Sequence, residues 1–225
     1  SVNMSLTASH SQNTRSKSVN LILPTFQGNM ERIYPFVKKN AQKKGIFENI
    51  NFQYTVRGEN RINTTDSLFL KKGMFDDAKY GMKHTIPIST NFKMFKHFSV
   101  SLNGNFEEVW TGSSILKNDF DVINNTQGEI VTIKGFNRYN QYDFGLSIGT
   151  TIYGLFNFKQ GKRIESIRHV IRPSISYNTR PSFEKYYDTY IIDADGNTAE
   201  YTRFEDSFFG RPSKAVSYTH LTLPT

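Results

Sequence analysis

The chain has 225 residues, no Cys, and 28 Lys and Arg against 20 Asp and Glu. The lack of Cys excludes disulfide scaffolds, thiolate catalysis and cysteine-based zinc sites, and no stretch approaches the roughly 18 apolar residues that a transmembrane helix needs. The net charge of +8 lies in short clusters between patterned segments without a zinc-finger, RNP or basic-helix motif, so nucleic acid is not an expected partner.

Alternation of apolar and polar side chains with a period of two runs along most of the chain. In residues 50–57 (INFQYTVR), the apolar side chains occupy the even positions and the polar ones the odd positions. This period predicts strands with two different faces. In chain order, we expect strands near residues 1–10, 18–34, 46–62, 82–94, 97–110, 136–158 and 164–178.

Strand and loop lengths indicate a membrane barrel more than a soluble sandwich. Several segments keep their pattern for ten or more residues, close to the roughly 9 to 11 of a tilted membrane strand. Connections at 95–97 and 159–163 are tight and 35–45 is intermediate, whereas 64–81, 111–135 and 178–212 are long; only 10–17 departs from the alternation. Short periplasmic turns and long external loops are typical of outer-membrane barrels. We predict an all-β, antiparallel up-and-down meander of about seven strands, a fragment of a large transmembrane outer-membrane β-barrel.

Aromatic and proline residues refine this prediction. Phe and Tyr residues flank the short connections and predict one interfacial girdle, while Trp110, Tyr139 and Tyr177 at the opposite strand ends predict the second. Pro87 and Pro173 lie inside strand patterns, where each removes a ladder donor and indicates a bulge or a seam of the barrel; a bulge is the commoner of the two, and we predict one at each proline.

The polar half of each alternation supplies the candidate functional residues. They are expected to face a barrel lumen, where they contact glycolipid or a plug, or simply wet the wall; they are Asn51, Gln53, Arg57, Ser101, Asn103, Asn105, Gln141, Asp143 and Ser147.

No constellation in the sequence indicates an enzyme, a cofactor site or a metal site. His residues are scattered one per segment without ligand spacing, and Glu107 and Glu108 are strand neighbours that must point to opposite faces. The stretch DADGN at 193–197 lacks the Gly and Glu positions of a calcium-binding EF-hand loop, so Asp195 and Gly196 are expected to form a hairpin turn.

Four stretches carry a family resemblance: SHSQN at 9–13, NMERIYPF at 29–36, NDFDVINN at 118–125 and RHVIRPSISY at 168–177. The most specific element is the strand motif formed by His169, Pro173 and Tyr177. Residues 1–214 resemble the LptD family of lipopolysaccharide-assembly barrels in the bacterial outer membrane. The resemblance implies a large barrel with a lateral opening, an upstream periplasmic jellyroll domain, lipopolysaccharide and outer-membrane lipid as ligands, and an LptE-like lipoprotein plug and the periplasmic Lpt bridge as partners.

Three other functions remain open: a porin or nutrient receptor, a barrel lipase or protease, and a secreted β-sandwich adhesin. No secretory leader pattern precedes the first strand, and we expect residues 1–215 to be part of a longer protein. Residues 216–225 (VSYTHLTLPT) match a reading frame of a sequencing adapter and are expected to be a library artefact.

Overall fold

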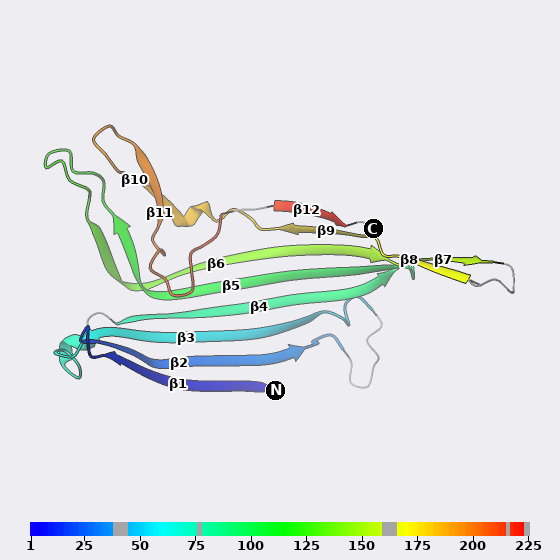
Figure 1. The fold of residues 1–225 in the computed structure, drawn as a ribbon, viewed down its shortest axis with the longest axis horizontal. Helices are drawn as coiled ribbons and strands as arrows, with labels where there is room; N and C mark the ends of the chain where they lie inside the picture. The colour runs from blue at the N-terminus through cyan, green and yellow to red at the C-terminus, as the bar shows by residue number, and fades with distance from the viewer. Residues whose placement is uncertain (38–44, 76–77, 159–165, 215–216, 223–225) are drawn as a thin grey trace.

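The computed structural model describes residues 1–37, 45–75, 78–158, 166–214 and 217–222. Antiparallel strands follow one another in a meander and form a curved, open sheet in the order β1-β2-β3-β4-β5-β6-β9-β12 (Figure 1). The predicted fold is therefore confirmed. The sheet strands are Val2–Asn13 (β1), Ser18–Ile33 (β2), Asn51–Thr65 (β3), Lys79–Met94 (β4), Phe98–Lys117 (β5), Ile130–Thr150 (β6), Ser174–Thr179 (β9) and Ser217–Thr222 (β12).

Two hairpins and two short helices lie outside this sheet. The hairpins pair Ile152–Asn157 (β7) with Ser166–Ile171 (β8), and Tyr187–Ile191 (β10) with Thr198–Thr202 (β11); the 3-10 helices are Lys72–Phe75 (η1) and Glu184–Tyr186 (η2). We call the end of the sheet near η1 and the β10–β11 hairpin the long-loop end, and the end near residues 95–97 and the β7–β8 hairpin the short-turn end (Figure 1). The tight turn at 14–17 lies at the long-loop end, so it is an exception to the alternation of loop lengths. The connection at 159–163 lies outside the described residues.

Strands β5 and β6 extend further than the sequence pattern predicts. Residues 111–135 were expected to be a long loop, but Ser113 pairs with Lys134 and Lys117 with Ile130. A register shift between Thr111 and Ser113 separates this outer part from the rest of the ladder. Because such an irregularity moves side chains to the opposite face, the alternation changes phase there and the sequence pattern fades.

Both prolines weaken pairing without shifting the register. Around Pro87, Phe52 pairs with Ile88 and Thr55 with Thr85, so β3 and β4 keep one register across the gap. Around Pro173, Gly149 pairs with Ser174 and Ile152 with Ile171, so β6–β9 and β7–β8 form one interrupted ladder. The predicted bulges are wrong. Each proline only removes an N–H donor, while the carbonyl of Pro173 still accepts from the Thr150 N–H at 3.1 Å.

The turn predicted between β10 and β11 is confirmed. Gly196 has φ of 81°, a conformation that glycine adopts at little cost. The Ile192 N–H donates to the Asn197 carbonyl at 2.9 Å and closes the hairpin.

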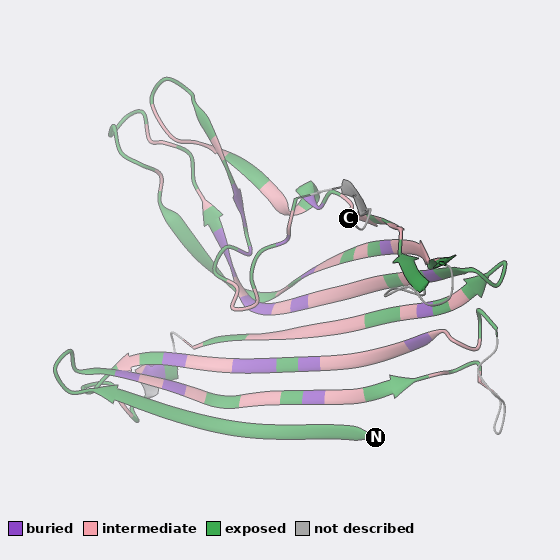
Figure 2. Ribbon diagram, turned by 45° about the vertical axis from the view of Figure 1, so that its right-hand side comes forward, coloured by how far each residue is buried: buried purple, intermediate pink, exposed green. Residues whose placement is uncertain are grey.

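The sheet buries little of its surface (Figure 2). Two small hydrophobic clusters lie at the long-loop end, one around Ile62 and the other around Tyr139. Large apolar side chains remain exposed along the strands, for example Val2, Met4 and Leu6 on β1 and Phe144 on β6. A contiguous exposed apolar surface of this kind marks contact with membrane or with another protein. Among the described residues, no helix is long and apolar enough to cross a membrane.

The second predicted aromatic girdle is only partly correct. Trp110 lies near the long-loop end and pairs with Met82, on the apolar face. Tyr139 lies on the opposite face, because it pairs with Val109 and is buried there. Tyr177 shares a cross-strand row with Leu146 and Leu102. The next row contains Phe92 and Val100, so Tyr177 lies near the short-turn end and not at the end where Trp110 lies.

The segment β12 lies within residues 216–225, which the sequence suggests are not native. It pairs antiparallel with the edge of β9. A free strand edge offers unpaired backbone groups to any extended segment, so this pairing does not depend on the origin of the residues. Their exclusion from the native chain stays a prediction.

Candidate functional site

All nine residues predicted to face the lumen lie on one face of the sheet. Asn51 pairs with Ser89, and Ser89 with Asn103. In the same ladder Asn105 pairs with Asp143. Directly paired residues share a face, and every second residue along a strand returns to it. We call this surface the polar face; the set is Asn51, Gln53, Arg57, Ser101, Asn103, Asn105, Gln141, Asp143 and Ser147. That this face lines a lumen stays a prediction.

Next to the charged part of the sheet, two rows of the polar face carry amides, hydroxyls and glycine and no charged side chain. Two adjacent cross-strand rows over β3, β4, β5, β6 and β9 form this neutral zone, which consists of Asn51, Ser89, Asn91, Ser101, Asn103, Gly145, Ser147, Ser176 and Asn178. Lys93 lies in the next row and is the nearest cation toward the short-turn end. An uncharged surface of this kind can hydrogen-bond sugar hydroxyls, and it forms no ion pairs with the charged groups of a ligand.

Local contacts hold the neutral zone in place. The Asn51 amide donates to the Ser89 carbonyl at 2.9 Å, and the Ser89 hydroxyl donates back to Asn51 Oδ1 at 3.0 Å. Asn103 and Asn178 lean over Gly145, since a Cβ built there would lie 2.6 Å from amide atoms of both residues. Glycine is therefore required at 145 for the two amides to occupy these positions.

Toward the long-loop end, the polar face is charged and its charges are paired. Glu59 is 7% exposed and accepts from Arg57 at 3.3 Å and from Arg61 at 2.6 Å. Lys83 and Glu107 form an ion pair at 2.9 Å. We call this surface the charged zone; it consists of Arg57, Glu59, Arg61, Lys83, Glu107 and Asp143.

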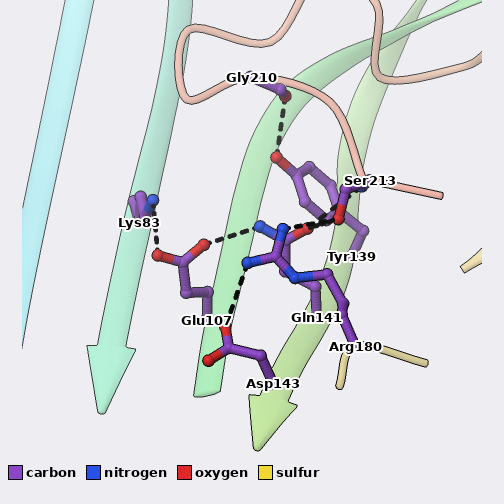
Figure 3. A network of polar contacts seen from close by, with 8 residues as sticks. All are labelled: Lys83, Glu107, Tyr139, Gln141, Asp143, Arg180, Gly210 and Ser213. Atoms are coloured by element: carbon purple, nitrogen blue, oxygen red, sulfur yellow. Dashed lines mark hydrogen bonds and ion pairs between the residues drawn. The ribbon is translucent and has the colours of Figure 1, made fainter. Parts of the chain in front are cut away.

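Residues 203–214, which we call the return segment, fold back over the charged zone (Figures 1 and 3). Gln141 connects the two, because its amide donates to Glu107 at 2.7 Å and its carbonyl oxygen accepts from the N–H and the hydroxyl of Ser213 at 3.2 and 3.3 Å. Arg180 donates to Asp143 at 3.2 Å and to the Ser213 hydroxyl at 3.1 Å. The return segment is thus fixed to two of the predicted polar-face residues.

An aromatic cluster anchors the other end of the return segment. Phe204 is 2% exposed and packs on Val109 and on the ring of Tyr139, with ring centroids 4.8 Å apart. The Tyr139 hydroxyl donates to the Gly210 carbonyl at 2.8 Å (Figure 3). Lys79 and Asp206 add an exposed ion pair at 3.1 Å. Because Phe204 and Tyr139 are both fully buried, this cluster is the strongest contact between the segment and the sheet.

Several residues of this arrangement were not among the predicted set. Lys83 and Glu107 occupy polar positions of their alternations, so the period of two could have included them. Tyr139 lies two residues before Gln141 and therefore shares its face. The spacing could have identified it, but as an aromatic residue it was assigned to the girdle. Arg180 and Ser213 lie outside any periodic pattern, and no local signal identifies them.

The strand motif of His169, Pro173 and Tyr177 does not form a cluster. His169, on β8, pairs with Gly154 on β7, whereas Tyr177, on β9, pairs with Leu146 on β6. The interruption at Pro173 lies between His169 and Tyr177. The described residues include no group of three His, Asp or Glu side chains able to hold a metal ion.

Comparison with known proteins decides the family. A family model described as "LptD protein" matches residues 1–223, nearly the whole chain. The chain belongs to the LptD family. No curated protein and no solved structure matches it. The open meander with one polar and one apolar face is consistent with a fragment of an LptD barrel wall.

Proposed function

We propose that this chain forms an arc of an LptD barrel that translocates lipopolysaccharide to the outer leaflet of the bacterial outer membrane. The supporting observation is the two-faced sheet: long antiparallel strands expose apolar side chains on one face and carry the neutral and charged zones on the other. The apolar face contacts membrane lipid and the polar face lines the lumen. Such a wall moves its cargo by non-covalent contacts alone and requires no catalytic group or cofactor.

The neutral zone is the part of the wall that contacts the sugar head group. Its amides and hydroxyls replace the hydrogen bonds that the sugar makes with water. Carboxylates near the path would repel an anionic head group, and the acidic residues of the charged zone are each paired with a cation. An LptE-like lipoprotein plug inside the barrel and the periplasmic Lpt bridge below it are the partners we propose.

Photo-crosslinking of adjacent residues tests this assignment in the full-length protein. A photoreactive amino acid at Asn103, on the polar face, is expected to capture lipopolysaccharide only while transport is active. The matched control at Leu102 points to the opposite face and is expected to capture membrane lipid whether or not transport runs. Equal capture of lipopolysaccharide at both positions, or none at Asn103, would contradict the proposal.

Depletion of the full-length protein distinguishes transport from a porin or nutrient-receptor role. Loss of an LptD barrel is expected to stop newly made lipopolysaccharide from reaching the cell surface. Normal surface lipopolysaccharide combined with reduced uptake of small solutes would assign the barrel to solute passage instead.

A further inference from the structure

The apolar face has a groove near the long-loop end, where apolar and polar side chains meet. It has a volume of about 290 Å³ and is lined mainly by Phe26, Gly58, Tyr80, Met82, Trp110 and Phe136. Its exposed surface is carbon. It spans the strands from β2 to β6, so it is a feature of the assembled sheet and not of one hairpin.

One row of cross-strand neighbours with a glycine in it lines part of the groove. Phe26, Gly58, Met82, Trp110 and Arg138 are successive partners across five strands and form a single row on the apolar face. Gly58 carries no side chain in this row, and Met82 packs closely beside it, since a Cβ at position 58 would lie 3.3 Å from Met82 Cε. Phe26 and Trp110, in the same row, also line the groove.

The polar boundary of the apolar face meets the groove at Trp110. On β1 and β2, apolar side chains continue up to this row, at Leu6 and Phe26. On β4, β5 and β6, a polar row of His84, Glu108 and Asn140 lies next to it on the short-turn side. The Glu108 carboxylate accepts from the Trp110 indole at 2.8 Å and from Arg138 at 3.2 Å. The Arg138 side chain is still 67% exposed, so its guanidinium has donors available to a second anion.

We propose that this groove binds one acyl chain of a lipopolysaccharide molecule in the outer leaflet, with a phosphate of that lipid on Arg138. The proposal rests on the proposed function, because it takes the apolar face as lipid-facing and the long-loop end as external. The carbon-lined groove suits a hydrocarbon chain, and the planar guanidinium at its rim suits a phosphate. Over β2 and β3 the groove adjoins the apolar row of Gly28 and Val56, so an acyl chain enters it from the bilayer on this side.

Trp110 is the single tryptophan of the chain and reports on the groove directly. Full-length protein is reconstituted into vesicles of phosphatidylcholine with brominated acyl chains, which quench indole fluorescence on contact. The Trp110 signal is taken as the difference from a Trp110→Phe variant. We expect the brominated lipid to quench Trp110 fluorescence strongly. Added lipopolysaccharide should restore the fluorescence at a mole fraction about fivefold lower than would be needed if it only diluted the brominated lipid.

Two variants test whether the groove itself is responsible. Gly58→Leu adds a side chain to the row that lines the groove and displaces Met82, and it is expected to abolish the selective recovery. Gly104→Leu is the matched control, because Gly104 lies on the same face and a Cβ there has only Asp143 backbone within 4 Å. Arg138→Gln is expected to keep the quenching but to lose the preference for lipopolysaccharide.

The outcomes separate the two proposals. Absence of quenching in the wild-type protein would contradict the lipid-facing assignment and with it the proposed function. Quenching with recovery that only follows dilution, or selective recovery that persists in Gly58→Leu, would overturn the groove proposal and leave the transport function standing.

Discussion

The neutral and charged zones are built on the same strands, yet they differ in charge and in what covers them. The neutral zone presents amides and hydroxyls, and its side chains are fixed by contacts within the sheet, such as that between Asn51 and Ser89. The charged zone pairs each carboxylate with a cation and lies under the return segment. This difference indicates that the charged zone is where a loop attaches. Contact of the neutral zone with a passing ligand is part of the function that we propose.

The largest expected effect concerns the aromatic anchor of the charged zone. Phe204→Ala removes a fully buried ring from Val109 and Tyr139, which should weaken docking of the return segment by about 3 kcal/mol. The measurement is the rate of chymotryptic cleavage after Phe209, which packs against the same cluster, in the folded protein; this rate is expected to rise steeply. Phe95→Ala, at a highly exposed position, is the control; an unchanged rate in Phe204→Ala would show that the segment is held by other contacts.

The second effect tests whether the charged zone is internally neutralised. Glu59→Gln leaves Arg57 and Arg61 without their shared carboxylate, and we expect the free energy of unfolding to fall by about 2 kcal/mol. Urea titration of the protein in detergent measures it. Glu129→Gln, at an exposed position, should change stability little, and equal effects of the two substitutions would contradict a structural role for the ion pairs.

A third, smaller effect addresses the neutral zone. Asn103→Asp places a negative charge beside Asn178 with little change in volume, and repulsion of an anionic head group should slow transport about fivefold. The readout is the rate at which newly made lipopolysaccharide reaches the surface. Asn103→Gln keeps the amide and should transport nearly normally; a similar rate for both variants would show that charge is tolerated in this zone.

The smallest effect lies outside the sheet, at the tip of the β10–β11 hairpin. Hydrogen bonds from the Asn197 side-chain amide and then its backbone N–H hold the pKa of Asp193 below its ordinary value. A lowered pKa means that the turn is stabilised at pH values above the ordinary pKa and loses this stabilisation as pH falls through the lowered one. Amide hydrogen exchange at Asn197, corrected for intrinsic rates, should accelerate over that range, and Asp193→Ala should abolish the pH dependence.

The sequence predicted the strands and their faces well because both depend on a local period. Gln141 and Asp143 were assigned to the correct face from alternation alone, and register then placed them beside Glu107 and Asn105. Tyr139 was misassigned because residue type was weighed above position. The outer parts of β5 and β6 were missed because the irregularity at Thr111 and Ser113 changes the phase of the alternation.

The return segment could not be predicted, since its contacts link residues far apart in the chain. Strands β7 to β11 lie between Tyr139 and Phe204 in the chain, and neither residue belongs to a motif that indicates the other. Hydrogen bonds such as that from Ser213 to Gln141 depend on the final path of a loop with no periodic pattern. Only the folded arrangement identifies this cover over the polar face.

The interruption at Pro173 has a mechanical consequence. Strand pairing is interrupted between Gly149 and Ile152 and then resumes in the same register. The β7–β8 ladder is therefore a continuation of the β6–β9 ladder across the interruption. Such a joint can bend at the proline while every hydrogen-bonded pair on either side keeps its partner. Strands β7 and β8 can therefore change direction at the short-turn end without sliding past each other, and side chains on both sides of the bend keep their neighbours.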